Sequence, residues 1–316
     1  MKLRKENDMK AQLVQHGVTF VRGMCMGVAE AIPGVSGSTI ALVLGIYDRF
    51  IDVLYGVSQV VKEVLLLVIE KSSIQKVKAS IRKIEWGFAI ALAVGMFTSI
   101  ILLAGLLGYW LEVHPQYVFA FFTGLILMSL SVPWDMIEKR TWKHVLVAFF
   151  TTLFFWLVFA ASPTTGLESP ALWYVFVGGM IGISAMVLPG VSGSFILLVM
   201  GLYEPILGKV KSLSGFDTSV IVPLLVFGAG ILFGFVLFVR VLKWVMARYH
   251  GWLMAFLTGI LVASFRIMWP FFEMNGEEVV YVLPWTIESQ ELGFIVLFLA
   301  MGTGAVALLK TLTPKI

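Results

Sequence analysis

The six-residue string PGVSGS occurs twice in this chain, at residues 33–38 and again at residues 189–194. Proline ends a helix, and glycine allows left-handed backbone and close approach of a neighbour. A helix that begins within each string would present free N–H groups and serine hydroxyls, which together suit a phosphate or a carboxylate. Small residues that merely let two segments pack closely are the alternative reading. The candidate binding residues are Pro33, Gly34, Ser36, Gly37, Ser38, Pro189, Gly190, Ser192, Gly193 and Ser194.

Three ionisable residues, Arg22, Glu30 and Arg266, lie within apolar segments, where charge is costly and is usually functional. Arg22 and Glu30 are eight residues apart, so two helical turns place them on roughly one face. We expect both arginines to pair with a bound phosphate, and Glu30 to change protonation beside it. Two alternatives stay open: either arginine reaches toward the membrane surface, or Glu30 pairs with Arg22 only to hold the segment in shape.

Enzyme chemistry has little support in the sequence. The four histidines, His16, His114, His144 and His250, lie near the ends of apolar segments, so none would serve a buried serine as a base. Cys25 is the single cysteine, which excludes an internal disulfide and offers no metal cluster. We therefore expect no catalytic residue, no metal and no cofactor.

The composition indicates a helical membrane protein. Hydrophobic residues make up 59% of the 316 residues and charged residues only 13%, and the mean hydropathy is +0.95. The apolar runs are continuous and do not alternate, which argues against a β-barrel. We read no removable signal peptide in the N-terminal stretch. The net charge of +4 would suggest nucleic-acid binding in a soluble chain, but here the distribution of Lys and Arg matters more, because it reports membrane topology.

The chain is an internal duplication. The two PGVSGS strings are 156 residues apart, and a second echo, AFFTGLILMS against AFLTGILVAS, has an offset of 135 residues. The 21-residue difference falls between the two echoes, where the first half carries a lysine-rich segment. We therefore divide one membrane domain, residues 1–316, into a first repeat at 17–161 and a second at 171–309.

Each repeat is predicted to hold three membrane spans and one re-entrant helical hairpin. About ten apolar residues follow each PGVSGS string, which cover only about half of the hydrocarbon core. We therefore place hairpins at 17–57 and 171–208, with the motif at each tip. The predicted spans are 86–111, 116–134, 143–161, 220–240, 251–270 and 291–309.

The distribution of Lys and Arg favours this topology. If both hairpins enter and leave on one side, the six basic residues of 62–83 lie in the cytoplasm with both chain termini, as the positive-inside rule demands. The second repeat then begins on the opposite side, so the repeats are inverted, as in many secondary transporters. In this all-α membrane fold, both motif tips meet near the middle of the bilayer.

An acid follows a Gly-x-Tyr after each motif, at Asp48 and at Glu204. We expect each acid at the C-terminus of its hairpin's second arm, where the helix dipole disfavours negative charge. The repetition is therefore notable, although a residue at the membrane interface beside tyrosine would explain it equally.

The strings PGVSGSTIALVLGIYDRFI and PGVSGSFILLVMGLYEPIL, with the duplication over nearly the full chain, resemble the PopT-type polyprenyl-phosphate translocases. The resemblance implies return of undecaprenyl phosphate, the lipid carrier of cell-wall synthesis, from the outer to the inner leaflet of the bacterial cytoplasmic membrane. A monophosphate needs an anion site that crosses the bilayer, while its polyprenyl tail stays in lipid. Protons are the candidate coupling ion, and the sequence leaves homo-oligomer formation open.

Two alternatives to this function belong to other classes. Membrane undecaprenyl-diphosphate phosphatases also have inverted repeats and a Pro-Gly-x-Ser motif, but theirs carries an arginine directly after the serine. Here that position is Gly37 in one copy and Gly193 in the other, so the arginine that would stabilise a transferring phosphoryl group is missing. A small-anion transporter is the third reading.

Overall fold

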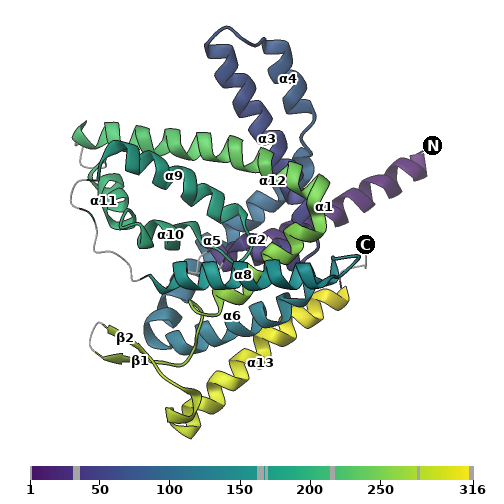
Figure 1. Ribbon diagram of the computed structural model, residues 1–316. Helices are drawn as coiled ribbons and strands as arrows, with labels where there is room; N and C mark the ends of the chain where they lie inside the picture. Colours follow the sequence, from purple (N-terminus) through teal and green to yellow (C-terminus); the bar gives the residue numbers. More distant parts are fainter. Residues whose placement is uncertain are drawn as a thin grey trace.

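The computed structural model describes residues 2–30, 36–161, 167, 170–213, 218–275 and 278–312, which form a bundle of α-helices with one small β-pair (Figure 1). The elements of the first half are α1 (Lys2–Glu30), α2 (Gly37–Val43), α3 (Tyr47–Val68), α4 (Ile74–Arg82), α5 (Trp86–Val113), α6 (Pro115–Ser129), α7 (Ser131–Asp135) and α8 (Trp142–Ala160). Those of the second half are α9 (Leu172–Val187), α10 (Gly193–Val199), α11 (Tyr203–Leu213), η1 (Thr218–Val220), α12 (Ile221–Ser264), β1 (Phe272–Asn275), β2 (Glu278–Tyr281), η2 (Pro284–Thr286) and α13 (Ser289–Leu312).

Five helical stretches are long and apolar enough to cross a membrane, so the chain is a multi-pass membrane protein. One of them, Thr218–Ser264, has 47 residues, which is about twice the length of one crossing. Tyr249 interrupts α12 with non-helical φ and ψ of −133° and 37°, and the bend separates the predicted spans 220–240 and 251–270. The second of these spans was predicted too long, because α12 ends at Ser264.

The second arms of both predicted hairpins are shorter than expected. α2 and α10 have seven residues each, and each is followed by a turn and a new helix. α10 and α11 meet at an angle of 108°, a bend that fits either a broken span or a re-entrant loop. Gly45 and Gly201, 156 residues apart, have φ of 65° and 66° in the two turns, a conformation that favours glycine.

The same helix contact occurs once in each half. A Cβ added to Gly95 of α5 would lie 2.1 Å from the carbonyl oxygen of Phe20 in α1. A Cβ added to Gly230 of α12 would lie 2.1 Å from the carbonyl oxygen of Phe176 in α9. The two glycines are 135 residues apart and the two phenylalanines 156, which are the offsets of the duplication. The repeated packing therefore matches the repeated sequence, while the inverted relation of the halves stays a prediction.

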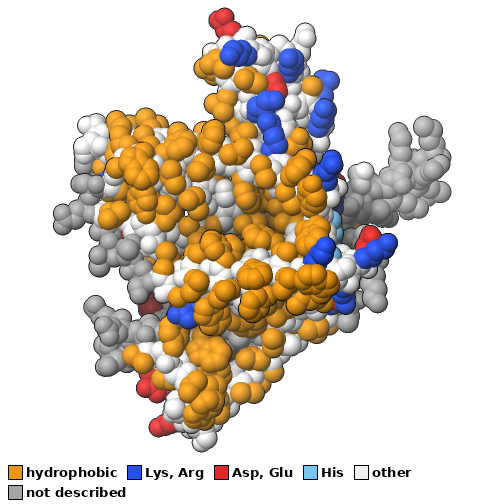
Figure 2. Space-filling model, viewed as in Figure 1, with side chains coloured by type: hydrophobic (Ala, Val, Ile, Leu, Met, Phe, Trp, Pro, Cys, Tyr) orange, Lys and Arg blue, Asp and Glu red, His pale blue; other side chains and the backbone are white. Residues whose placement is uncertain are grey.

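The two ends of the bundle differ in charge. At one end, Asp135 of α7 pairs with Arg140 at 2.9 Å and with Lys310 of α13 at 3.2 Å. At the other end, the Gln116 side chain donates to the carbonyl oxygen of Phe272 and joins α6 to the unpredicted pair β1–β2. We call these the basic end, with Lys139, Arg140, Arg248 and Lys310, and the acidic end, with Glu112, Glu273, Glu288 and Glu291. Figure 2 shows a broad hydrophobic surface over the helices between these ends.

Candidate functional site

The first motif begins a short, deeply buried helix. Ser36 has extended backbone angles of −120° and 132° and precedes α2, as predicted for a helix that starts within the string. The Ser36 hydroxyl lies 2.6 Å from the Ser38 hydroxyl, and these two side chains are 1% and 2% exposed. Pro33 and Gly34 lie outside the described residues.

The Glu30 side chain accepts a hydrogen bond from a backbone amide that was predicted to bind the anionic ligand. Its Oε2 accepts a hydrogen bond from the backbone N–H of Gly37 at 2.8 Å. A Cβ at Gly37 would lie 2.9 Å from that oxygen and 3.0 Å from the carbonyl oxygen of Met26, so glycine permits the approach. Glu30 and Arg22 form no ion pair with one another, both side chains being among those described. The Glu30 side chain therefore lies where a phosphate oxygen was expected, and the Gly37 amide, which was expected to be free, is hydrogen-bonded to it.

The second motif repeats the hydroxyl pair. Pro189 and Gly190 form a turn after α9, and Gly190 has the left-handed φ of 85° that favours glycine. Ser192 then precedes α10 with extended angles of −98° and 126°. The hydroxyls of Ser192 and Ser194 lie 2.8 Å apart, as their counterparts do in the first motif.

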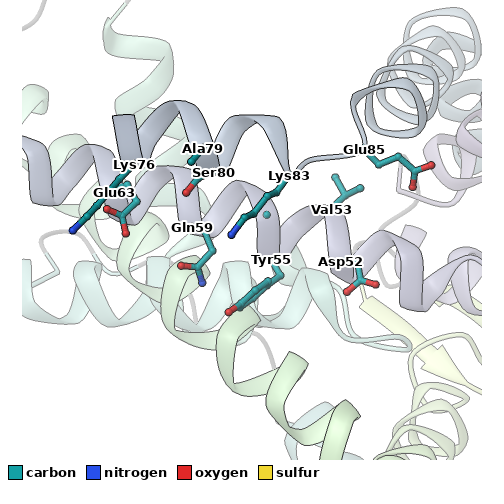
Figure 3. Close-up of a pocket in the computed structure, with 11 residues that line it drawn as sticks. Asp52, Val53, Tyr55, Gln59, Glu63, Lys76, Ala79, Ser80, Lys83 and Glu85 are labelled. Carbon is teal, nitrogen blue, oxygen red and sulfur yellow. The ribbon is translucent and has the colours of Figure 1, made fainter. Parts of the chain in front are cut away.

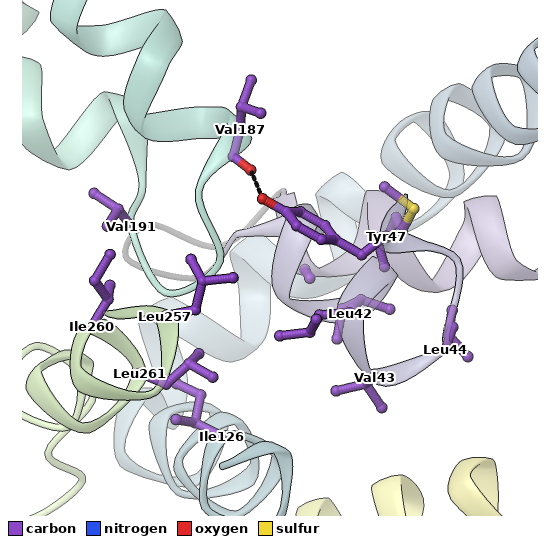
Figure 4. Close-up of a cluster of buried hydrophobic side chains, with 14 of the residues drawn as sticks. Leu42, Val43, Leu44, Tyr47, Ile126, Val187, Val191, Leu257, Ile260 and Leu261 are labelled. Carbon is purple, nitrogen blue, oxygen red and sulfur yellow. Dashed lines mark hydrogen bonds between the residues drawn. The ribbon is translucent and has the colours of Figure 1, made fainter. Parts of the chain in front are cut away.

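The two motif regions contact one another through residues within and next to the PGVSGS strings. The backbone N–H of Gly190 donates to the Thr39 hydroxyl at 2.9 Å. The Ser36 hydroxyl donates to the carbonyl oxygen of Met186 at 3.4 Å. The Tyr47 hydroxyl donates to the carbonyl oxygen of Val187 at 3.2 Å (Figure 4). These three hydrogen bonds thus join residues that are at least 140 positions apart in the sequence.

A buried apolar cluster surrounds this contact. Leu42 and Val43 of α2 face Leu257, Ile260 and Leu261 of α12 across the cluster in Figure 4. All five side chains are buried. Hydroxyls held in such surroundings make stronger electrostatic interactions than they would in water.

The two halves of the site differ in exposure. Ser38 is buried, whereas its counterpart Ser194 is exposed. Tyr47 is 2% exposed, whereas its counterpart Tyr203 is 37% exposed. Ser36, Gly37 and Ser38, the described residues of the first motif, are therefore enclosed in this structure, and Ser194 makes the second motif the more accessible one.

The structure places the two arginines apart from the hydroxyl pairs. Arg22 lies half-buried in α1, two turns before Glu30. Arg266 lies in the turn after α12 and not within a span, and its guanidinium carbon lies 5.3 Å from the ring centre of Trp156. Among the described residues, neither arginine forms a hydrogen bond with a motif serine.

The position predicted for the two repeated acids is wrong. Asp48 and Glu204 lie in the first turn of α3 and of α11, because a new helix begins at the preceding tyrosine. At that end the helix dipole stabilises a carboxylate. A favourable interaction with the helix dipole therefore accounts for the repetition.

Sequence reasoning missed Thr39 and Tyr47 as residues that join the motifs. Thr39 has Phe195 as its repeat counterpart, so the duplication gives no sign of its role. Tyr47 has Tyr203, and the repeated Gly-x-Tyr was the one available signal.

A cavity of about 350 Å³ lies at the acidic end, and Ile267, the residue after Arg266, is part of its lining. Apolar and aromatic side chains dominate its lining, and Glu112 is its one charged residue. The lining residues include Phe119, Ile267, Trp269, Phe272 and Tyr281. Such a lining suits a hydrocarbon chain better than a soluble anion.

Comparison with known proteins agrees with the membrane architecture. A family described as undecaprenyl phosphate translocase-like matches residues 26–280. The chain is 34% identical over 288 residues to a polyprenyl-phosphate transporter of Vibrio cholerae. This match covers 89% of the present chain and 84% of the Vibrio protein. It is also 27% identical over 272 residues to a polyprenyl-phosphate transporter of Staphylococcus aureus. That match covers 80% of the present chain and 86% of the Staphylococcus protein. No solved structure matches the chain significantly. The chain therefore belongs to the undecaprenyl phosphate translocase-like family, whose members are transporters and not enzymes.

Proposed function

We propose that this protein carries a polyprenyl phosphate, with undecaprenyl phosphate as the expected lipid, from the outer to the inner leaflet of the bacterial cytoplasmic membrane. The observation that carries the proposal is the contact between the two PGVSGS motifs through Thr39 and Gly190. A pair of serine hydroxyls lies on each side of that contact. Transport returns the carrier to the leaflet where cell-wall precursors are loaded.

The two hydroxyl pairs are the proposed phosphate ligands. Hydroxyls can both donate to and accept from phosphate oxygens, and as neutral groups they bind the anion without holding it permanently. The exposure of Ser194 makes the second motif the first point of contact in the state described here. The enclosed pair, Ser36 and Ser38, would take the phosphate after a rearrangement of the contact between the motifs.

Glu30 is proposed to exchange with the phosphate. Its side-chain oxygen already accepts the N–H of Gly37, which is the donor proposed here for a phosphate oxygen. A bound phosphate would compete for that amide, and two anions side by side repel one another. Protonation of Glu30 removes the repulsion and supplies a donor to the phosphate, which makes protons the proposed coupling ion.

The arginines are proposed to act at successive stages. Arg266 directly precedes Ile267, which lines the apolar cavity near the acidic end, and a polyprenyl chain is proposed to enter there with its headgroup toward the guanidinium. Arg22 lies in α1, two helical turns before Glu30. Both residues belong to the first half of the chain, whereas Arg266 belongs to the second. The basic end is proposed to face the cytoplasm, because cytoplasmic segments carry the excess of Lys and Arg.

Phosphorus NMR of proteoliposomes tests the proposal. A polyprenyl monophosphate has a resonance separate from that of the phosphodiester lipids, and external Mn²⁺ broadens only the outward-facing molecules. With the purified protein, the protected monophosphate signal should decay with time, whereas in protein-free vesicles it should persist. Encapsulated inorganic phosphate should stay protected, and added undecaprenyl diphosphate should release no phosphate. Loss of encapsulated phosphate without movement of the lipid would overturn the proposal in favour of a small-anion transporter.

A further inference from the structure

The hairpin formed by α3 and α4 has its polar and apolar faces reversed relative to a hairpin in water. Tyr55, Gln59 and Glu63, spaced by four residues on α3, line a cavity between the two helices. Ser80 and Lys83 of α4 line its opposite wall. Figure 3 shows the side chains that line this cavity. Each helix therefore presents polar side chains to its partner.

Several exposed apolar side chains of the hairpin lie outside that cavity, although Val53 and Ala79 are part of its lining. On α3, Val64 and Val68 are four residues apart and both exposed, and Val68 is 77% exposed. On α4, Ile74 and Ile81 are seven residues apart, which places them on one face, and Ile74 is 61% exposed. Neither group lines the cavity. Exposed apolar faces on both helices require an apolar environment outside the hairpin.

The direction and charge of the hairpin identify that environment as lipid. In Figure 1, α3 and α4 project from the bundle roughly across the direction of α8, so they would lie along the membrane plane if α8 crosses it. Asp52 of α3 pairs with Lys243 in the half of α12 that leads to the basic end. The segment 62–83 holds six basic and two acidic residues, and Figure 2 shows basic side chains beside hydrophobic ones there. Such a pattern is typical of helices at an anionic lipid surface.

The cavity between the two helices is suited to an anion. It has a volume of about 680 Å³. Its acids have basic partners, because Asp52 pairs with Lys243, Glu85 accepts from Arg49 at 2.7 Å, and Glu63 pairs with Lys62 at 3.7 Å. Glu63 also accepts from Ser72 and interacts electrostatically with Lys76. Lys76 and Lys83 also line the cavity, and within the described part of the chain neither forms an ion pair. Two lysines with the hydroxyls of Tyr55 and Ser80 can hold a phosphate group.

We propose that the α3–α4 hairpin lies in the leaflet at the basic end and binds the phosphate headgroup of an anionic phospholipid between Lys76 and Lys83. The acyl chains then cover the outward faces of Val68 and Ile74. This site is separate from the PGVSGS motifs and does not depend on the transported substrate. The second half of the chain has no hairpin of this kind among its described residues, since α11 is followed at once by η1 and α12.

Titration of the purified full-length protein in neutral detergent tests the headgroup site, with a short-chain phosphatidylglycerol as the probe. Lys76→Gln/Lys83→Gln should weaken binding on the order of tenfold. Lys78→Gln/Arg82→Gln removes the same charge from the same helix but away from the cavity, and should change affinity little. Equal loss in the two double variants would overturn the site, because general attraction to a basic helix would then suffice.

Two further measurements separate the lipid from its alternatives. Glycerol phosphate, which has the phosphate without acyl chains, should not displace the lipid; displacement at similar concentrations would mean that the site takes a soluble phosphate.

In a Cys25→Ser background, a fluorophore on Ile74→Cys should be quenched by spin-labelled acyl chains in phosphatidylglycerol vesicles. A fluorophore on Gln75→Cys, which lies to the side of that face, should be quenched less. Absence of quenching at position 74 would place the hairpin in water and overturn the proposal.

Discussion

The backbone N–H of Gly190 donates a hydrogen bond to the hydroxyl of Thr39, with 2.9 Å between nitrogen and oxygen. Gly190 belongs to the second PGVSGS motif, and Thr39 directly follows the first. The bond is buried, so neither group has water as a substitute partner. One side chain thus joins the two halves of the chain at the proposed transport site.

Thr39→Val should destabilise the protein because it keeps the shape of the side chain but leaves the Gly190 N–H unpaired. An unpaired buried donor costs about 1–3 kcal/mol. Thr19→Val is the matched control, since Thr19 is equally buried but its hydroxyl donates only to the carbonyl oxygen of Gln15 within the same helix. Thermal unfolding in detergent should show a larger decrease in Tm for Thr39→Val, and equal decreases would contradict the role given to this bond.

Tyr47→Phe should slow transport more than Tyr203→Phe in the proteoliposome assay. The first substitution removes the buried bond to the Val187 carbonyl, whereas Tyr203, its repeat counterpart, is 37% exposed. The loss of one such bond is worth about 1 kcal/mol, or several-fold in a rate or equilibrium. If both variants transport equally well, the difference in exposure between the halves has no bearing on the transport cycle.

Arg266→Ala should weaken polyprenyl-phosphate binding by about tenfold or more, because a charge-assisted contact is worth roughly 1.5–3 kcal/mol. Arg266→Lys keeps the charge and should retain part of the affinity, which separates charge from stacking on Trp156. The same test on Arg22→Ala decides between a ligand and a side chain that reaches the membrane surface. Unchanged binding and complementation in either alanine variant would remove that arginine from the site.

Glu30→Gln should abolish the dependence of transport on a pH gradient while keeping the fold. The amide oxygen of glutamine can still accept from the Gly37 N–H, but the side chain no longer exchanges a proton. Glu30→Ala, which leaves that amide without its partner, should also lower Tm and serves as the comparison. Transport by Glu30→Gln that remains equally dependent on the pH gradient would show that Glu30 is not the coupling group.

The sequence predicts the local features of this site well and its long-range contacts only in outline. Pro, Gly and Ser are strong local signals, so helices that begin after Ser36 and Ser192 could be predicted. The bonds of Thr39 and Tyr47 depend on how the two halves pack, which no local pattern reports. Charge suggested Arg22 as one alternative partner of Glu30, but the Glu30 side chain instead accepts the amide of Gly37, seven residues further along the chain.

For the fold too, the sequence predicts local features better than long-range packing. The apolar runs predict the long helices, and the duplication predicts where they recur. The break at Tyr249 follows the prediction, because Arg240, Lys243 and Arg248 interrupt the apolar run between the predicted spans 220–240 and 251–270. The end of α12 at Ser264 was not predictable from hydropathy, because mostly apolar residues follow it. Periodicity likewise indicates that α4 is amphipathic, but not which face meets α3.

Movement of polyprenyl phosphate by motif variants tests the central claim most directly. The Mn²⁺-protected monophosphate resonance is followed in proteoliposomes that contain wild type, Ser36→Ala/Ser192→Ala, or the control Ser58→Ala, whose buried hydroxyl donates to a carbonyl three residues away. We expect decay of the protected signal for wild type and Ser58→Ala, and a much slower decay for the motif variant with its fold intact. Decay at the wild-type rate in the motif variant would contradict the account.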